Sequence, residues 1–157
     1  MLPLIIFWMA AAFITYTYVG VSLLIILRAL LRPRHFRQED ITPRVTMLIA
    51  AYNEERDIVD KLDNILALDY PRDRLQVIIA SDGSTDATNR LVSPFTERHE
   101  HIRLLALPRL GKAGALNAAA AQANGEILVF SDGNSKYAPS AIRQIVRPFA
   151  DPSVGGV

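Results

Sequence analysis

The chain opens with one long apolar stretch. From Leu4 to Leu27 the side chains are apolar apart from a few small or aromatic polar groups, and residues 1–27 carry no charge. As a helix, these residues rise about 36 Å at roughly 1.5 Å each, enough to cross a hydrocarbon core about 30 Å thick. We therefore predict a transmembrane helix within residues 1–31.

Two other interpretations of this stretch were weighed. A cleaved signal peptide places Lys or Arg before a shorter apolar run and a small-residue cleavage site after it. Here the arginines, beginning with Arg28, follow the run instead. A buried helix of a soluble protein rarely continues this long without a charged residue, so the membrane span is the better interpretation.

The segment after the apolar stretch is basic. Residues 28–44 hold five arginines against Glu39 and Asp40, a net charge of 5 − 2 = +3. Cytoplasmic flanks of membrane spans are enriched in Lys and Arg, which predicts a single span in the inner or plasma membrane, with Met1 outside and the rest cytoplasmic. Prolines and mixed charge predict that residues 32–44 are a basic linker.

From Val45 onward, apolar runs alternate with amphipathic stretches. The apolar runs predict buried strands at residues 45–51, 75–80, 102–107 and 127–131. The amphipathic stretches predict helices at residues 54–68, 86–95, 112–123 and 139–149. Pro94 is expected to end or kink the second of these helices. Repeated strand–helix–strand units imply right-handed crossovers and therefore an α/β fold with a mostly parallel sheet.

Polar residues follow three of the predicted strands. They are Tyr52, Asn53 and Glu54 after the first strand, Asp82, Gly83 and Ser84 after the second, and Asp132, Gly133 and Asn134 after the fourth. Ligands of parallel α/β sheets bind at the carboxyl ends of the strands. The three groups together predict a ligand site along one rim.

The residue types suggest which chemistry this rim could perform. Asp132 and Asn134 offer oxygen ligands for Mg²⁺ or Mn²⁺, although Asp132 could instead form an Asx-turn. Asp82 could accept a hydrogen bond from a nucleobase or a ribose hydroxyl, or could belong to the turn before the next helix. Both roles are compatible, because Asp86 suits the first turn of that helix and leaves Asp82 facing the cleft.

Lys112 lies in the sequence RLGKAGALN, ahead of a predicted helix. Its ammonium could lie near phosphates, although a solvated loop lysine is the simpler interpretation of the local sequence. The segment is not a P-loop, because Ala113 stands where Ser or Thr is required and Ala106 where a glycine is required. A G-x-G-x-x-G sequence follows none of the strands, which argues against dinucleotide binding.

Composition excludes two further classes. The chain has no cysteine, so disulfides and thiolate metal sites are excluded. Residues 45–157 hold 12 Lys and Arg against 14 Asp and Glu, a net charge of 12 − 14 = −2. A slightly acidic domain lacks the basic surface that nucleic acid requires, so we expect no nucleic-acid partner.

Four motifs in this order resemble the family 2 glycosyltransferases of GT-A fold. They are AYNEE (51–55), SDGSTD (81–86), RLGKAGALN (109–117) and FSDGNS (130–135). The resemblance covers residues 45–157 and implies a partial GT-A domain, a Rossmann-like nucleotide-binding fold.

The resemblance also implies roles for individual residues. Tyr52, Asn53 or Glu54 would belong to the nucleotide pocket, and Asp82 would contact the base. Lys112 would lie near the diphosphate. Asp132 matches the first aspartate of the D-x-D metal site of the family. The sequence departs from the family pattern at two positions: Ser81 replaces an acidic residue found in many members, and Asn134 replaces the second metal aspartate.

The implied function is a membrane-bound glycosyltransferase. It would use a nucleoside-diphosphate sugar, with a UDP-sugar expected, together with Mg²⁺ or Mn²⁺, and transfer the sugar to a glycan or lipid acceptor. The catalytic base and the Gln-x-x-Arg-Trp segment of processive members would lie beyond Val157, so the domain is expected to be incomplete at its C-terminal end. A truncated, inactive nucleotide-binding module is the alternative. A nucleotidyltransferase would need a basic, glycine-rich loop where this chain has AYNEE.

Overall fold

The computed structural model describes residues 1–31 and 36–157. The chain divides into two compact units, Met1–Phe36 and Arg37–Val157, and each is described by itself. Residues 32–35 of the predicted linker lie outside the described residues.

The first unit is an apolar helix. It consists of α1 (Leu2–Thr15), a π-helical turn (Tyr16–Gly20) and α2 (Val21–Leu31). Together they form one helix, Leu2–Leu31, that is long and apolar enough to be a candidate membrane span, as the sequence predicted. The hydroxyls of Thr15, Thr17 and Ser22 each donate to the carbonyl four residues earlier, so these polar groups are satisfied within the helix.

The described part of the linker is irregular, and its end is attached to the second unit. Residues 36–44 form neither helix nor strand. The Tyr70 hydroxyl donates to the Pro43 carbonyl at 2.6 Å, and Arg74 donates to the Thr42 carbonyl at 2.6 Å. The last linker residues therefore lead directly into the first strand.

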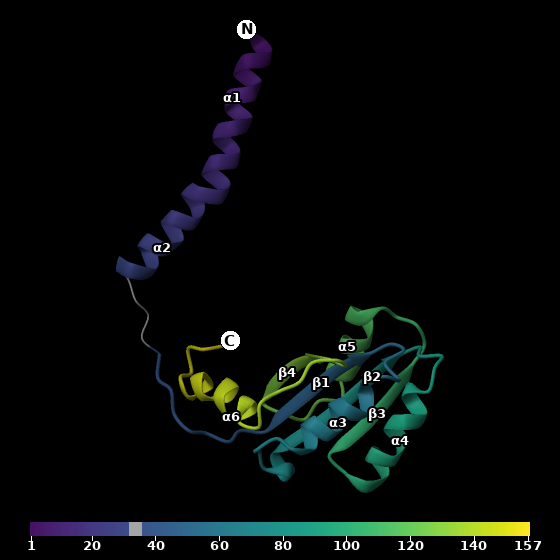
Figure 1. The fold of residues 1–157 in the computed structure, drawn as a ribbon. Coiled ribbons are helices and arrows are strands. Elements are labelled where there is room, and N and C mark those ends of the chain that lie inside the picture. The colour runs from purple at the N-terminus through teal and green to yellow at the C-terminus, as the bar shows by residue number, and fades with distance from the viewer. Residues whose placement is uncertain (32–35) are drawn as a thin grey trace. The chain divides into compact units, whose positions relative to one another are not determined.

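The second unit is built on a four-stranded parallel sheet in the order β3-β2-β1-β4 (Figure 1). The strands are β1 (Val45–Ala51), β2 (Leu75–Asp82), β3 (Ile102–Leu107) and β4 (Ile127–Asp132). In the registers, Ala50 of β1 lies opposite Ala80 of β2 and opposite Asp132 of β4. The carboxyl ends of these three strands therefore lie at one level, and the predicted α/β class with a parallel sheet is confirmed.

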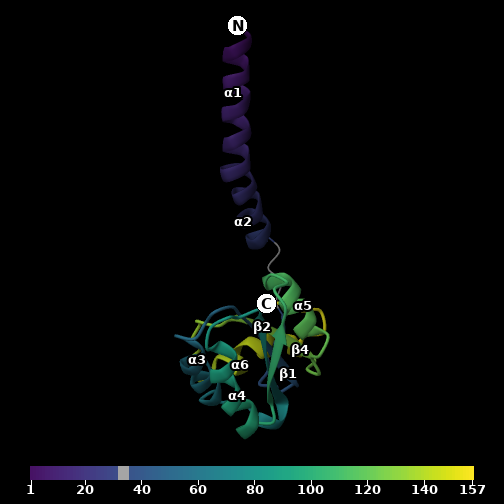
Figure 2. The same cartoon turned by 90° about the vertical axis from the view of Figure 1, so that its right-hand side faces the viewer.

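Helices cover both faces of the sheet (Figure 2). They are α3 (Ile58–Leu66), α4 (Thr88–Arg98), α5 (Lys112–Ala120) and α6 (Ala141–Val146), the last followed by a 3₁₀ turn (Arg147–Ala150). Apolar residues of α3, α4 and α6 pack against one face, which includes Met47 and Ile79. Ala115 and Ala119 of α5 pack against Leu48, Ile78 and Ala80 on the other face.

Pro94 does not end the second helix of this unit, so the prediction that the helix could end there was wrong. Helix α4 continues through Pro94 to Arg98. The buried side chain of Val92 and the partly buried Leu91 and Phe95 pack on the same core, and this packing outweighs the hydrogen bond that Pro94 cannot donate. The helix α3 begins at Ile58, later than predicted, because residues 52–57 form turns that serve the site described below.

Candidate functional site

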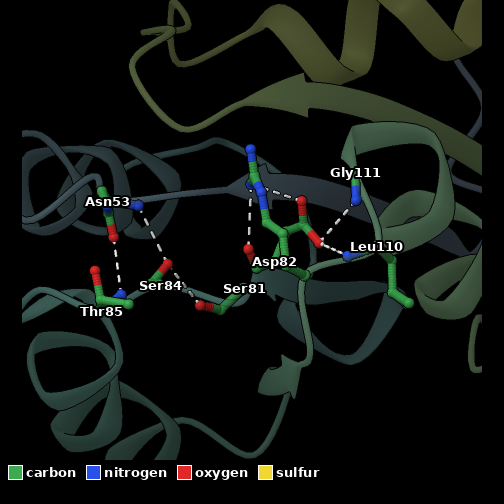
Figure 3. A network of polar contacts seen from close by, with 8 residues as sticks. Asn53, Ser81, Asp82, Ser84, Thr85, Leu110 and Gly111 are labelled. Carbon is green, nitrogen blue, oxygen red and sulfur yellow. Dashed lines mark hydrogen bonds and ion pairs between the residues drawn. The ribbon is translucent and has the colours of Figure 1, made fainter.

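The loop after β1 is bonded to the loop after β2. Asn53 has a positive φ of 54°, a left-handed conformation that Asn adopts more readily than most residues. Its backbone N–H donates to the Ser84 hydroxyl at 3.2 Å, and its side-chain carbonyl accepts from the Thr85 N–H at 2.9 Å (Figure 3). Asn53 therefore holds two strand-end loops together, and this part of the rim is pre-formed.

Asp82, at the end of β2, is turned toward the loop that precedes α5. Its side chain is 3% exposed. One carboxylate oxygen accepts from the Leu110 and Gly111 N–H groups at 2.5 and 3.1 Å, and the other pairs with the Arg109 guanidinium at 2.7 Å (Figure 3). Asp82 thus anchors residues 109–111 beside the carboxyl end of β2.

Gly83 makes this anchoring possible. Its φ is +67°, and a Cβ at this position would lie 2.9 Å from the Arg109 nitrogen. Any other residue would therefore strain the backbone and push the 109–111 loop away from Asp82.

Arg109 is a site residue that the sequence analysis did not select. Its guanidinium lies 3.4 Å from the centre of the Tyr52 ring while it pairs with Asp82. This stacked arrangement is a cation–π contact. The only signal for Arg109 in the sequence is that it is a basic residue in the same motif as Lys112. Its contact with Tyr52, which lies far away in the sequence, cannot be inferred from residue spacing.

A cavity of about 170 Å³ lies where these groups meet. It is lined by Ala50, Ala51, Tyr52, Glu54, Asp82, Arg109 and Lys112. The structure thus brings together four predicted site residues, whereas Asn53 faces the 84–85 turn. A larger hollow of about 800 Å³ beside β4 and α6 is lined mainly by apolar residues. The small cavity instead gathers charged side chains at the carboxyl ends of the strands, where ligands of parallel α/β sheets bind, and is therefore the better candidate for chemistry.

The loop after β4 adds charged groups beside this cavity. The Lys112 ammonium forms an ion pair with the Asp132 carboxylate, and both side chains are more than half exposed. A Cβ on Gly133 would lie 3.1 Å from the Glu54 side chain, which places Glu54 directly against this loop. Burial, followed by the negative charges of Asp57, Asp132 and Asp86, raises the pKa of Glu54 above its usual value.

Residues 46–157 match the family model "Glycosyl transferase family 2". The chain belongs to this family.

Among the relatives of this family 2 member are a mannosyltransferase and two synthases. The structure of the mannosyltransferase from Pyrobaculum calidifontis, in complex with GDP-Man and Mn²⁺, is 37% identical in sequence with a TM-score of 0.75, covering 92% of this chain and 44% of that chain. A beta-monoglucosyldiacylglycerol synthase of Nostoc is 33% identical over 131 residues, 80% of this chain and 28% of the relative. A poly-beta-1,6-N-acetyl-D-glucosamine synthase of Staphylococcus aureus is 34% identical over 114 residues, 72% of this chain and 27% of the relative.

The family match and the similarity to the solved mannosyltransferase confirm the GT-A-like fold of this family 2 chain. The chain spans between about a quarter and less than half of the length of the relatives named here. Ser81, one of the departures from the family pattern, is fully buried and its hydroxyl is bonded to that of Ser84 at 2.9 Å. A neutral residue suits this position, because a second carboxylate beside Asp82 would be buried without a partner.

The residues near β4 fit a hard divalent cation by their chemistry. Asp132 and Asn134 supply oxygen atoms, and Glu54 adds a carboxylate against the same loop. Burial is the main cause of the raised pKa of Glu54, and the negative charges of Asp57, Asp132 and Asp86 add to it. A bound cation would offset only that added negative charge. Within residues 1–31 and 36–157, three or more acidic or histidine side chains do not gather into a ready-made metal cluster. The remaining ligands would therefore come from a diphosphate or from water.

Proposed function

We propose that this chain forms the donor-binding part of a membrane-anchored glycosyltransferase. The enzyme would use a nucleoside-diphosphate sugar with Mg²⁺ or Mn²⁺ and would transfer the sugar to a glycan or lipid acceptor. The observation that carries the proposal is the convergence of Tyr52, Asp82, Arg109 and Lys112 on one cavity at the carboxyl ends of parallel strands, beside Asp132. Family membership and the fold support it.

Each residue would have a distinct role toward the nucleotide. The Tyr52 ring offers an aromatic face for stacking on a base. Asp82, whose carboxylate is fixed by the 109–111 loop, would accept from the base or ribose. Lys112 would donate to the diphosphate. A cationic donor beside the leaving diphosphate would stabilise the negative charge that develops there.

Asp132 and Asn134, with Glu54 nearby, would hold the divalent cation. A bound cation neutralises the charge that accumulates on the leaving diphosphate. Because Lys112 already pairs with Asp132, its ammonium would have to leave the carboxylate as the cation binds. The exposed Lys112 side chain could then turn toward the phosphates, so metal and nucleotide binding are expected to be coupled.

The nucleotide base is the least constrained part of this proposal. A UDP-sugar is the donor that the sequence motifs suggest, whereas the relative with a TM-score of 0.75 was solved with GDP-Man. UDP and GDP therefore both belong in the test.

The direct test is nucleotide binding to the chain in detergent, measured by calorimetry with Mn²⁺ or with a chelator. We expect UDP or GDP to bind more tightly with Mn²⁺, and Asp132→Ala to weaken Mn²⁺-dependent binding at least about tenfold. Asp60→Ala is the matched control, because Asp60 also forms an exposed ion pair with a lysine but does not line the cavity. Absence of Mn²⁺-dependent binding of either nucleotide to folded wild-type chain would contradict the proposal.

Turnover is expected to need residues outside this chain. The carboxylates at the cavity are poorly placed to act as the catalytic base. Asp82 accepts hydrogen bonds from the 109–111 loop, and Asp132 and Glu54 lie at the proposed cation site. A general base must reach the acceptor hydroxyl. We therefore expect the chain to bind the donor without transferring the sugar. Transfer by residues 1–157 alone would show that the base is within them.

A further inference from the structure

Lys61 is a buried lysine for which the mechanism above has no use. It lies on α3 and is 1% exposed, whereas the side chains of Lys112 and Lys136 are more than half exposed. Lysine is rarely buried to this extent without a partner. What the ammonium contacts therefore indicates what it does.

The partners of Lys61 lie on both sides of one turn. Its ammonium donates to the Ser131 hydroxyl at 2.7 Å and to the Ser135 carbonyl at 2.6 Å, and it lies 4.4 Å from the centre of the Tyr137 ring. Residues 132–134, with the candidate metal ligands Asp132 and Asn134, lie between the two serines. The buried ammonium thus connects the residue before the turn to the residue after it.

Besides Lys61, the exposed Lys112 pairs with Asp132, and Asn64 of α3 forms two hydrogen bonds with the Tyr137 backbone just after the turn. The turn itself is weakly bonded. Its own backbone bond, from the Ser135 N–H to the Asp132 carbonyl, is long at 3.4 Å. Both Lys61 bonds are much shorter, and they begin on a helix that is fixed by the core residues Ile58, Leu62 and Ile65. The position of the turn relative to the sheet is therefore set largely from α3.

Burying the charged ammonium of Lys61 at this position is unfavourable for stability. Burial lowers the pKa of Lys61 to about 8, against the opposing attraction of Asp132. A well-packed apolar side chain in place of a buried charge is often neutral or stabilising. Stability alone therefore gives a weak reason for a lysine between α3 and β4, and the contact with the turn gives a better one.

We propose that Lys61 is a positioning residue that fixes the 132–134 turn, so that the oxygen atoms of Asp132 and Asn134 are presented together to a divalent cation. The inference rests on the proposed function, because it assumes that this turn binds the cation. The inference adds Lys61, a residue of α3 that would touch neither the metal nor the nucleotide. Metal-dependent binding of the donor would nevertheless depend on it.

The test is Lys61→Met, which keeps an unbranched apolar side chain and removes both hydrogen bonds and the charge. UDP and GDP are titrated into the full chain with MnCl₂ and with a chelator, and thermal unfolding is followed by circular dichroism. We expect about a tenfold to hundredfold loss of nucleotide affinity in Mn²⁺, the range for residues that orient metal ligands. Affinity in chelator should not change, whereas a merely structural role would lower both affinities together.

Two further variants make the result decisive. Lys136→Met removes an exposed lysine next to the same turn and should behave like the wild type. Ser131→Ala removes one of the two Lys61 bonds and should give a smaller loss with Mn²⁺, and it decides the question if Lys61→Met does not fold.

The outcomes separate this inference from the proposed function. Mn²⁺-dependent binding that is equal in wild type, Lys61→Met and Ser131→Ala would overturn the role of Lys61 alone. If wild-type binding does not depend on Mn²⁺, the metal role of the turn and the inference built on it both fail.

Discussion

The carboxylate of Asp82 both holds the 109–111 loop in place and pairs with a charged residue of the cavity. It is nearly inaccessible and accepts from two backbone N–H groups of the 109–111 loop, while its second oxygen pairs with Arg109 at the edge of the cavity. In the proposed function, Asp82 would affect nucleotide binding both directly and through the loop that it holds. Its removal should therefore be measurable in stability as well as in affinity.

We expect Asp82→Ala to lower the free energy of unfolding by about 1–3 kcal/mol, because the Leu110 and Gly111 N–H groups lose their acceptor. Nucleotide binding should be lost as well. Asp82→Asn keeps an acceptor for the loop but loses the charge that pairs with Arg109, so it should be the more stable of the two variants. Urea denaturation followed by circular dichroism measures both. Equal stability of Asp82→Ala and wild type would show that the loop does not depend on this carboxylate.

Lys112 is expected to affect two ligands in opposite directions. Because its ammonium pairs with Asp132, Lys112→Met should free the carboxylate and tighten the binding of Mn²⁺ alone. The same variant should weaken UDP or GDP binding about fivefold, the factor that corresponds to roughly 1 kcal/mol of exposed charge interaction. Calorimetric titrations with Mn²⁺ alone and with nucleotide separate the two effects. If both affinities fall together, Lys112 does not compete with the cation for Asp132.

At the scale of elements, the sequence predicted the strands well because each is an apolar run with a single polar residue, and buried parallel strands favour such runs. The helix boundaries were less predictable. Residues 54–57 fit the helical pattern of α3, yet the helix begins only at Ile58. The backbone N–H of Glu54 donates to the Thr88 hydroxyl at 2.9 Å. Contacts between distant loops, such as this bond and the stacking of Arg109 on Tyr52, depend on the strand order, which local pattern does not contain.

Helix α4 allows the stabilisation from tertiary packing to be compared with the low helix propensity of proline. Pro94 lies inside the helix at an exposed position, where it cannot donate a backbone hydrogen bond. Pro94→Ala should raise the free energy of unfolding by about 1–3 kcal/mol, since Pro is roughly 3 kcal/mol less favourable than Ala in a helix interior. Ser93→Ala, at the neighbouring exposed position, should change stability much less. A Pro94→Ala variant that is no more stable in urea than wild type would mean that the helix already accommodates the proline without cost.

At the scale of the whole molecule, the chain joins an apolar helix to a GT-A-like fold through a basic segment. The polar side chains Thr15, Thr17 and Ser22 are satisfied within the helix, which removes the main penalty for placing them in hydrocarbon. The proposed anchoring would keep the donor site near a membrane-bound acceptor. The arginines that come after the helix, beginning with Arg28, predict that the second unit lies on the cytoplasmic side.

The absence of cysteine makes this orientation directly measurable. Single cysteines are introduced as Leu2→Cys, at the N-terminal end of the helix, and as Ser153→Cys, at an exposed position of the second unit. In intact bacterial cells made permeable only at the outer membrane, a membrane-impermeant maleimide should label Leu2→Cys and spare Ser153→Cys until the inner membrane is opened. The reason is that Lys and Arg flanking a span are retained on the cytoplasmic side. The reverse pattern would place the nucleotide-binding fold outside, away from cytoplasmic nucleotide-sugars, and would contradict the proposed function. Labelling of both cysteines in sealed cells would instead contradict the single span.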